Sequence, residues 1–251
     1  MIKDDRKEFE ENKVKNIKNL GKDTKLFTNS KEMIKELDKH DYTYLWSWLG
    51  LPIIQWPADI MATQEIIWET KPDVIIETGV ARGGSMIFLA AMQKIIGKGK
   101  VIGIDVDIRK HNKTAIEEHI LSDRITMIEG SSTDQNTFEE VKSLIKPGEK
   151  VMVILDSDHS YQHVFSECQL YSSLVSEGCY LVIADTVVGH FLEGEIVGKR
   201  SKNWFKGDEP LKARDVFLSQ NKDFEIAPIN NKLVLSSSPG GYLRRLKVQK
   251  L

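Results

Sequence analysis

Short apolar runs alternate with amphipathic helical patterns through the middle of the chain. Two of the runs, Val151–Leu155 and Tyr180–Ala184, are apolar throughout, as expected of strands that are covered on both faces. The alternation predicts an α/β domain with a doubly wound, mostly parallel sheet. The predicted strands are Val74–Glu77, Val101–Asp105, Ile125–Glu129, Val151–Asp156 and Leu181–Ala184. The predicted helices are Ala58–Glu69, Ser85–Ile96, Lys110–Glu118, Asp134–Ile145, Gln162–Ser173 and Leu211–Gln220.

The pattern changes after the fifth strand. Residues from Asp185 to about Asp208 are rich in Gly, Lys and Glu, which predicts a long loop able to close over a site. Two short strands, Phe224–Ile226 and Lys232–Ser236, follow the last helix and are separated by Asn230-Asn231. This arrangement predicts a C-terminal antiparallel hairpin at the sheet edge.

The N-terminal region differs in amino-acid composition from the rest of the chain. Residues 1–41 form a charged arm in which only Ser30–Leu37 has the pattern of a capped amphipathic helix. The arm is either a solvated extension or a helix that joins subunits, and a homo-oligomer is expected. The domain, residues 42–251, begins with Tyr42–Pro57, which is rich in aromatic residues and interrupted by prolines. This segment is either packing surface or part of a wall for an acceptor substrate.

Composition narrows the class of protein. At 251 residues, 41% hydrophobic and 29% charged, the chain is long enough for one globular domain with a buried core. A net charge of −2 argues against a nucleic-acid partner, which would require an excess of Lys and Arg. The two cysteines, Cys168 and Cys179, have no metal-ligand spacing, as is typical of a reducing cytoplasm. No apolar run approaches the ~20 residues of a membrane span, so we expect a cytoplasmic protein without a membrane partner.

The first predicted strand ends in an acidic residue and a glycine-rich turn, Glu77–Ser85. Such a turn lets backbone N–H groups approach a ligand, and Asp105 ends the next strand where a ribose diol would lie. The glycines do not follow the G-x-G-x-x-G spacing of nicotinamide dinucleotide sites, and Glu77 would repel a pyrophosphate. An acidic residue there favours S-adenosylmethionine, which carries an ammonium and a sulfonium. The predicted cofactor-binding residues are Glu77, Gly79, Ala81, Gly83, Ser85, Asp105, Ser131, Ser132 and Asp156.

A second group of polar residues follows the fourth and fifth strands. Asp156 and Asp185 end strands that are expected to be neighbours, so their carboxylates can converge on one Mg²⁺ ion. His159 lies three residues beyond Asp156, and an imidazole is the side chain best suited to act as a general base at neutral pH. The alternative is that Asp156 and Asp158 cap the following helix. The remaining histidines lack this setting and are expected to be ordinary surface or core residues: His40, His111, His119, His163 and His190.

Five motifs together resemble the cephalosporin hydroxylase family. The resemblance covers about Tyr42 to Arg245 and rests on Trp48–Ile53, Ile75–Ser85, Gly103–Arg109, Leu155–Ser160 and Pro239–Arg245. It implies a Rossmann-like fold of the class I methyltransferase type, related to sugar O-methyltransferases. It also implies that His159 is a catalytic base and that Asp156 is a catalytic metal ligand. Relatives have Glu-Asp where this chain has Ala184-Asp185-Thr186, so Asp185 and Thr186 are the remaining metal-ligand candidates.

These observations predict an S-adenosylmethionine-dependent, Mg²⁺-assisted O-methyltransferase that acts on a hydroxyl of a sugar or small molecule. The loop Val187–Asp208, with Phe191, Trp204 and Phe205, is predicted to line the acceptor pocket. Two alternatives stay open at this point. One is a nicotinamide-dependent oxidoreductase or epimerase, and the other is an S-adenosylmethionine-binding subunit without catalytic activity.

Overall fold

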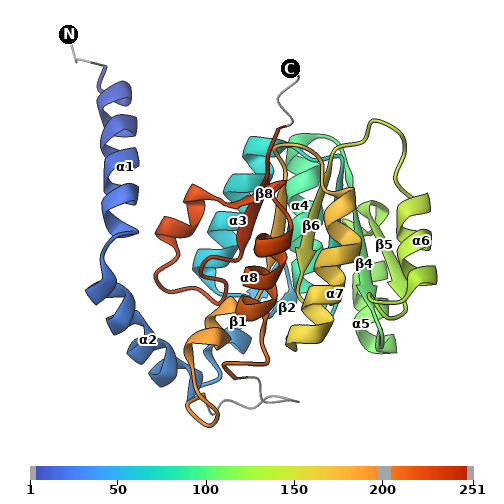
Figure 1. The fold of residues 1–251 in the computed structure, drawn as a ribbon. Coiled ribbons are helices and arrows are strands. Elements are labelled where there is room, and N and C mark those ends of the chain that lie inside the picture. Colours follow the sequence, from blue (N-terminus) through green and yellow to red (C-terminus); the bar gives the residue numbers. More distant parts are fainter. Residues whose placement is uncertain (1–3, 197–204, 248–251) are drawn as a thin grey trace.

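The computed structural model describes residues 4–196 and 205–247. Within them, a central sheet has the strand order β5-β4-β3-β6-β7-β9-β8 (Figure 1). β3 to β7 run parallel, and β9 is antiparallel to both β7 and β8. The strand order reverses direction between β3 and β6, which is where open α/β sheets bind ligands. The sheet strands are β3 (Val74–Thr78), β4 (Lys100–Asp105), β5 (Ile125–Glu129), β6 (Val151–Leu155), β7 (Tyr180–Ile183), β8 (Phe224–Ile226) and β9 (Tyr242–Arg245).

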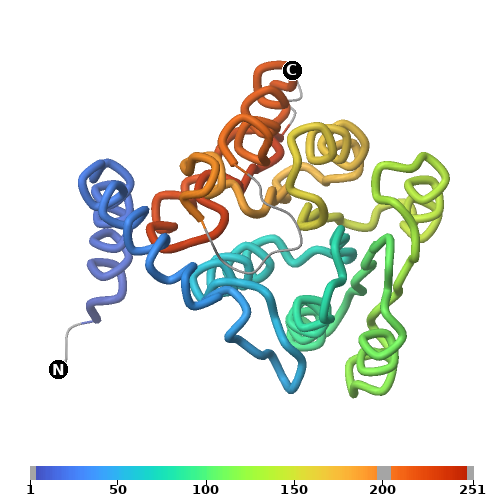
Figure 2. Tube along the Cα trace, turned by 90° about the horizontal axis from the view of Figure 1, so that it is seen from below, coloured from blue at the N-terminus to red at the C-terminus, as the bar shows by residue number. Residues whose placement is uncertain are grey.

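Helices cover both faces of the sheet (Figure 2). Apolar residues of α3, α4 and α5 form the core on one face, and those of α6, α7 and α8 form it on the other. Their bounds are α3 (Pro57–Thr70), α4 (Gly84–Ile96), α5 (Lys110–Glu117), α6 (Gln135–Ser143), α7 (Tyr161–Tyr171) and α8 (Pro210–Gln220). The predicted doubly wound fold is therefore confirmed, and each helix and parallel strand predicted from residue 58 onward agrees with the structure to within two residues at either end.

The N-terminal arm is more helical than predicted. It contains two helices, α1 (Arg6–Leu20) and α2 (Thr24–Asp38), which lie beside the main body in Figure 1. α1 buries no residue, so it has no apolar stripe from which a helix can be predicted. α2 is amphipathic and begins after Asp23, whose side chain accepts a hydrogen bond from Leu26 N–H. No helix in the described part of the chain is both long and apolar enough to cross a bilayer.

The C-terminal hairpin is formed by a different second strand from the one predicted. β8 pairs with β9, whereas the predicted strand Lys232–Ser236 is irregular and its first residue closes a 3₁₀ turn, Pro228–Lys232. Ser236 is turned inward, where its hydroxyl donates to the buried carboxylate of Asp59. Because this hydrogen bond fixes the segment inside the molecule, the chain reaches the sheet edge only after Gly241, whose backbone N–H donates to Ser238 O.

The aromatic segment before α3 forms a small hairpin. β1 (Trp46–Trp48) pairs antiparallel with β2 (Leu51–Ile53), and the two-residue turn has Leu49 and Gly50 at positive φ, as a type I′ turn requires. The hairpin packs on α4, where Trp48 contacts Phe88 edge to face with ring centroids 4.9 Å apart. The hairpin thereby extends over the glycine-rich turn at the start of α4.

Candidate active site

The turn after β3 is held tightly against its neighbours. Gly79 has φ +94, and a Cβ there would overlap the carbonyl oxygen of Asp156. Gly84, the first residue of α4, is equally restricted, since a Cβ would overlap the carbonyl oxygen of Pro52 in β2. The turn therefore requires glycine because backbones from β6 and β2 approach it closely.

Glu77 lies at the base of this turn and is fully buried. Its Oε2 accepts a 2.7 Å hydrogen bond from Ser85 Oγ. Burial raises the pKa of Glu77 to about 8, and the Ser85 hydrogen bond opposes part of that rise. The structure thus pairs two of the predicted cofactor residues in a site where a cation would stabilise the carboxylate.

Asp105 binds the backbone of the same turn. Its Oδ2 accepts hydrogen bonds from Val80 N–H at 2.9 Å and from Ala81 N–H at 3.1 Å. A cavity of about 400 Å³ opens beside it, between the carboxyl ends of β3, β4 and β6. The predicted cofactor residues that line this cavity are Gly79, Ala81, Asp105, Ser131, Ser132 and Asp156.

A polar network that the sequence did not reveal borders the same cavity. His163 Nε2 lies 3.0 Å from Ser132 Oγ and 3.5 Å from Glu167 Oε1. Ser157 Oγ donates to the same Glu167 oxygen at 2.7 Å. Ser132 comes from the segment after β5 and Glu167 from α7 itself, and His163 lines the cavity with Ser132, so it lies at the site and not on an ordinary surface. The sequence feature that could have indicated this network is the i, i+4 spacing of His163 and Glu167 on a predicted helix.

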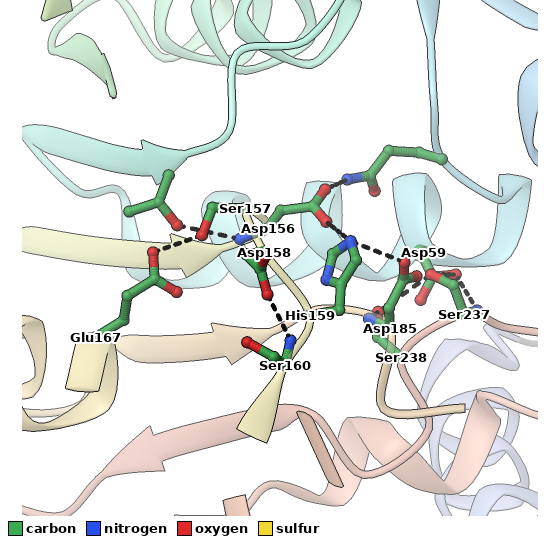
Figure 3. A network of polar contacts seen from close by, with 12 residues as sticks. Asp59, Asp156, Ser157, Asp158, His159, Ser160, Glu167, Asp185, Ser237 and Ser238 are labelled. Carbon is green, nitrogen blue, oxygen red and sulfur yellow. Dashed lines mark hydrogen bonds and ion pairs between the residues drawn. The ribbon is translucent and has the colours of Figure 1, made fainter. Parts of the chain in front are cut away.

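Asp156, His159 and Asp185 converge beyond the ends of β6 and β7 (Figure 3). Each offers a ligand atom, and these atoms lie within 4.8 Å of one another. His159 Nε2 is 3.2 Å from Asp185 Oδ2 and 4.0 Å from Asp156 Oδ1. Burial raises the pKa of Asp156, and the nearby carboxylate of Asp185 adds to the rise. Two carboxylates held this close in a buried setting favour binding of a cation.

Thr186 lies apart from these three residues. It is fully buried, and its hydroxyl donates to the carbonyl oxygen of Pro239 at 2.9 Å. The structure therefore corrects its predicted place at the metal: Thr186 fixes the Pro239–Gly241 turn beneath Asp185 instead. Gln55, which the sequence analysis did not single out, contacts the cluster, because its Nε2 donates to Asp156 Oδ2 at 3.0 Å.

Asp59 is a buried acid that the sequence analysis missed. Its carboxylate accepts hydrogen bonds from Ser236 Oγ at 2.6 Å and from Ser237 N–H at 2.9 Å. Burial raises its pKa to about 6, against the effect of these hydrogen bonds. Ser238 Oγ in turn accepts from Asp185 N–H at 3.3 Å. Asp59 thus orders the serine segment that supports Asp185, and its partners lie too far along the chain for a local pattern to predict them.

A second cavity, of about 280 Å³, joins the glycine-rich turn to the Asp156 cluster. Trp56 of the aromatic segment is buried, as the packing role predicts, and it also lines this cavity. The predicted acceptor loop contributes Phe191, whereas Phe205 forms a bridge with Asp208 and is not a lining residue. Trp204 lies outside the described residues. Gln55 of the aromatic segment and Val187 and Val188 of the predicted loop also line this cavity, and other parts of the chain contribute Ile34, Asp38 and Ser237.

A family model described as Rhamnosyl O-methyltransferase/CmcI matches residues 40–246. The chain belongs to this family. The rhamnosyl O-methyltransferase of Mycobacterium bovis is 32% identical over 206 residues, which cover 79% of this chain and 78% of that protein. The protein of the same name from Mycobacterium leprae is 34% identical over 149 residues, covering 57% and 62% of the two chains. The predicted family and enzyme class, an O-methyltransferase, are confirmed.

Solved methyltransferase structures show the same fold. An apo structure of CmcI-N160 superposes with a TM-score of 0.58 at 23% identity, covering 82% of this chain and 78% of that one. MycE methyltransferase from the mycinamycin pathway, in complex with Mg, SAH and mycinamycin VI, superposes with a TM-score of 0.51 at 15% identity, covering 86% and 55%. The methyltransferase fold of the Rhamnosyl O-methyltransferase/CmcI family is thus established for this chain.

Proposed function

We propose that this protein transfers a methyl group from S-adenosylmethionine to a hydroxyl of a sugar or a sugar-bearing natural product, with Mg²⁺ at the Asp156 cluster. One observation carries the proposal: the Asp156, His159 and Asp185 cluster and the glycine-rich turn line the same cavity. The names of relatives agree with the acceptor class, since curated members methylate rhamnosyl groups and MycE was solved with mycinamycin VI.

The residues fit the two absent groups. Glu77 is a fully buried carboxylate with a raised pKa, so a bound ammonium would favour its charged form. Asp156 and Asp185 provide the oxygen ligands that Mg²⁺ prefers. When bound, S-adenosylmethionine supplies an electrophilic methyl group, and Mg²⁺ supplies positive charge that favours loss of a hydroxyl proton.

The chain's own residues supply alignment and proton transfer. His159 accepts the proton of the acceptor hydroxyl at Nε2, and Asp185, 3.2 Å away, stabilises the imidazolium that forms. Gln55 and the Asp59-supported serine segment hold Asp156 and Asp185 in position. The glycine-rich turn fixes the donor in line with the acceptor oxygen, which lowers the entropy cost of methyl transfer.

Calorimetry tests the cofactor first. S-adenosylmethionine should bind the metal-free protein, and NAD⁺ should not; binding of NAD⁺ alone would replace the proposal with an oxidoreductase. Methyl transfer to p-nitrophenyl glycosides, measured as S-adenosylhomocysteine released, then tests the activity. Turnover should fall when a chelator is titrated in and should recover with added Mg²⁺. Turnover that is unchanged across the titration would remove the metal from the mechanism.

A further inference from the structure

The cavity beside the Asp156 cluster has a wall that neither the cofactor motifs nor the metal cluster accounts for. Ile34 and Asp38, on the last turns of α2, both line it. Both side chains are buried, with 5% and 6% of their surface exposed. α2 precedes the residues matched by the family model, which begin at 40. The acceptor side of the cavity therefore combines a segment from the matched region with one from outside it.

Contacts of three kinds fix α2 against the segment that follows β7. Ile34 packs in one apolar cluster with Trp56, Val187, Val188 and Phe191. Lys35 Nζ forms a partly buried ion pair with Glu195 Oε1 at 2.9 Å. Phe27 meets His190 edge to face with ring centroids 5.8 Å apart. Anchored in this way at successive turns, α2 presents its cavity-lining residues in a defined position.

Phe27 contacts His190 as an uncharged ring. Burial lowers the pKa of His190 to about 4, and the positive charges of Lys31, Arg214 and Lys206 contribute to the shift. Because the imidazole is uncharged at neutral pH, Phe27 packs on it as on an aromatic hydrocarbon. At neutral pH this contact therefore involves no charge on His190.

The chemistry of the cavity is divided between its sides. Ile34, Val187 and Phe191 form an apolar strip. The arm contributes the carboxyl group of Asp38 to the cavity. Asp156 and Asp185 belong to the cluster at the strand ends. A sugar ring matches such a division, since it carries several hydroxyls around an apolar ring face. A carboxylate is the usual partner of a sugar hydroxyl that is not reacting, because the hydrogen bond to a charged acceptor is strong.

We propose that α2 is part of the acceptor subsite, in which Asp38 accepts a hydrogen bond from a non-reacting hydroxyl of a sugar and Ile34 packs against its apolar part. This inference rests on the proposed function and extends it by naming specificity residues on the arm. The acceptor class is a glycoside that has at least two free hydroxyls, one to be methylated and one to bind Asp38.

The test compares Asp38→Asn with Glu36→Gln, an exposed residue of the same helix. The probes are the p-nitrophenyl glycosides of α-L-rhamnose, α-L-fucose, β-D-glucose and β-D-galactose. We expect Asp38→Asn to raise KM for the methylated glycoside about tenfold or more, since hydrogen bonds to charged groups are worth this much. The value of kcat and the affinity for S-adenosylhomocysteine should stay within about twofold. Glu36→Gln should match the wild type in all three.

Ile34→Ala and Ile34→Leu provide a second pair, matched by Met33→Ala on the exposed face of α2. Ile34→Ala should raise KM, and Ile34→Leu should restore most of the affinity. Equal KM values for Asp38→Asn and Glu36→Gln would overturn the role of Asp38. Binding of S-adenosylhomocysteine without methylation of any glycoside would overturn the acceptor class, whereas loss of that binding in the wild type would overturn the proposed function itself.

Discussion

The donor side and the acceptor side of the site are built in different ways. The proposed donor side comes from residues 77–85 and from Asp105, which lie at the carboxyl ends of the consecutive parallel strands β3 and β4. The acceptor side is assembled from α2, the β1–β2 hairpin, the segment after β7 and Ser237. A fixed cofactor is bound by a local motif, whereas a variable acceptor is bound by segments that only the fold brings together.

The largest effect should come from the residue proposed to accept the proton of the acceptor hydroxyl. His159→Ala should lower turnover by about 10²–10⁴-fold, the range for loss of a general base, while the affinity for S-adenosylhomocysteine stays within about twofold. Single-turnover kinetics and calorimetry measure the two quantities. His111→Ala, on the exposed surface of α5, is the control. Loss of cofactor binding together with turnover would mean that His159 belongs to the donor side.

The next effect concerns the donor side alone and depends on pH. The pKa of Glu77 is raised in the folded state from 4.5 to about 8, so the folded protein retains a proton that the unfolded chain releases. The stability of the cofactor-free protein should therefore fall as pH rises from 4.5 to 8. In Glu77→Gln this part of the fall should disappear, which makes the variant more stable at pH 8 by at most about 5 kcal/mol.

Chemical denaturation at pH 5 and at pH 8 measures this difference. The two proteins should have similar stability at pH 5 and should diverge at pH 8, since glutamine keeps the hydrogen bond from Ser85 without acquiring a charge. If the free energies of unfolding of the two proteins change with pH in the same way, then water or a movement of the turn must solvate the Glu77 carboxylate. Saturating S-adenosylmethionine should reduce the difference, because its ammonium would stabilise the charged carboxylate.

A smaller effect should appear where the two sides touch. Gly84→Ala places a Cβ against the carbonyl oxygen of Pro52, which should cost about 1–3 kcal/mol of folding free energy and weaken cofactor binding. Gly97→Ala is the matched control, since nothing lies within 4 Å of a Cβ at this position. Its φ of +86 is unfavourable for alanine, and this backbone strain should cost about 1 kcal/mol of folding free energy. Cofactor affinity in the control should be unchanged. Equal cofactor affinities in the Gly84→Ala and Gly97→Ala variants would mean that the contact between the glycine-rich turn and β2 does not affect the cofactor site.

The smallest effect tests the anchor of the acceptor side. Lys35→Met removes the ion pair with Glu195 and should lower stability by about 1 kcal/mol or less, with a KM rise of only a few fold. Lys39→Met removes an exposed pair with Glu36 on the same helix and should change neither quantity. Thermal melts at low and high salt measure the effect, which should shrink as salt screens the pair. A salt-independent loss would assign the effect to the contact of Lys35 with Phe191.

The same contrast explains what the sequence could predict. Val151–Leu155 is apolar throughout and is followed by Asp156, so both the strand and the residue at its end could be placed from the pattern. The Lys232–Ser236 strand was wrong because the attraction of Ser236 to Asp59 is a contact across the fold. α1 was missed because none of its side chains is buried. Ile34 could be assigned to a helix, but neither it nor Asp38 could be assigned to a cavity, since that depends on where α2 docks.

The contact of Gly84 with Pro52 limits how the enzyme can change during evolution. Because two backbones meet there without room for a methyl group, the β1–β2 hairpin cannot shift to suit a new substrate without disturbing the donor. Ile34, by contrast, packs on apolar side chains, and Asp38 lines the cavity. New acceptor preferences should therefore arise by substitution in the arm, and libraries intended to redirect this enzyme to other glycosides should begin at these two positions.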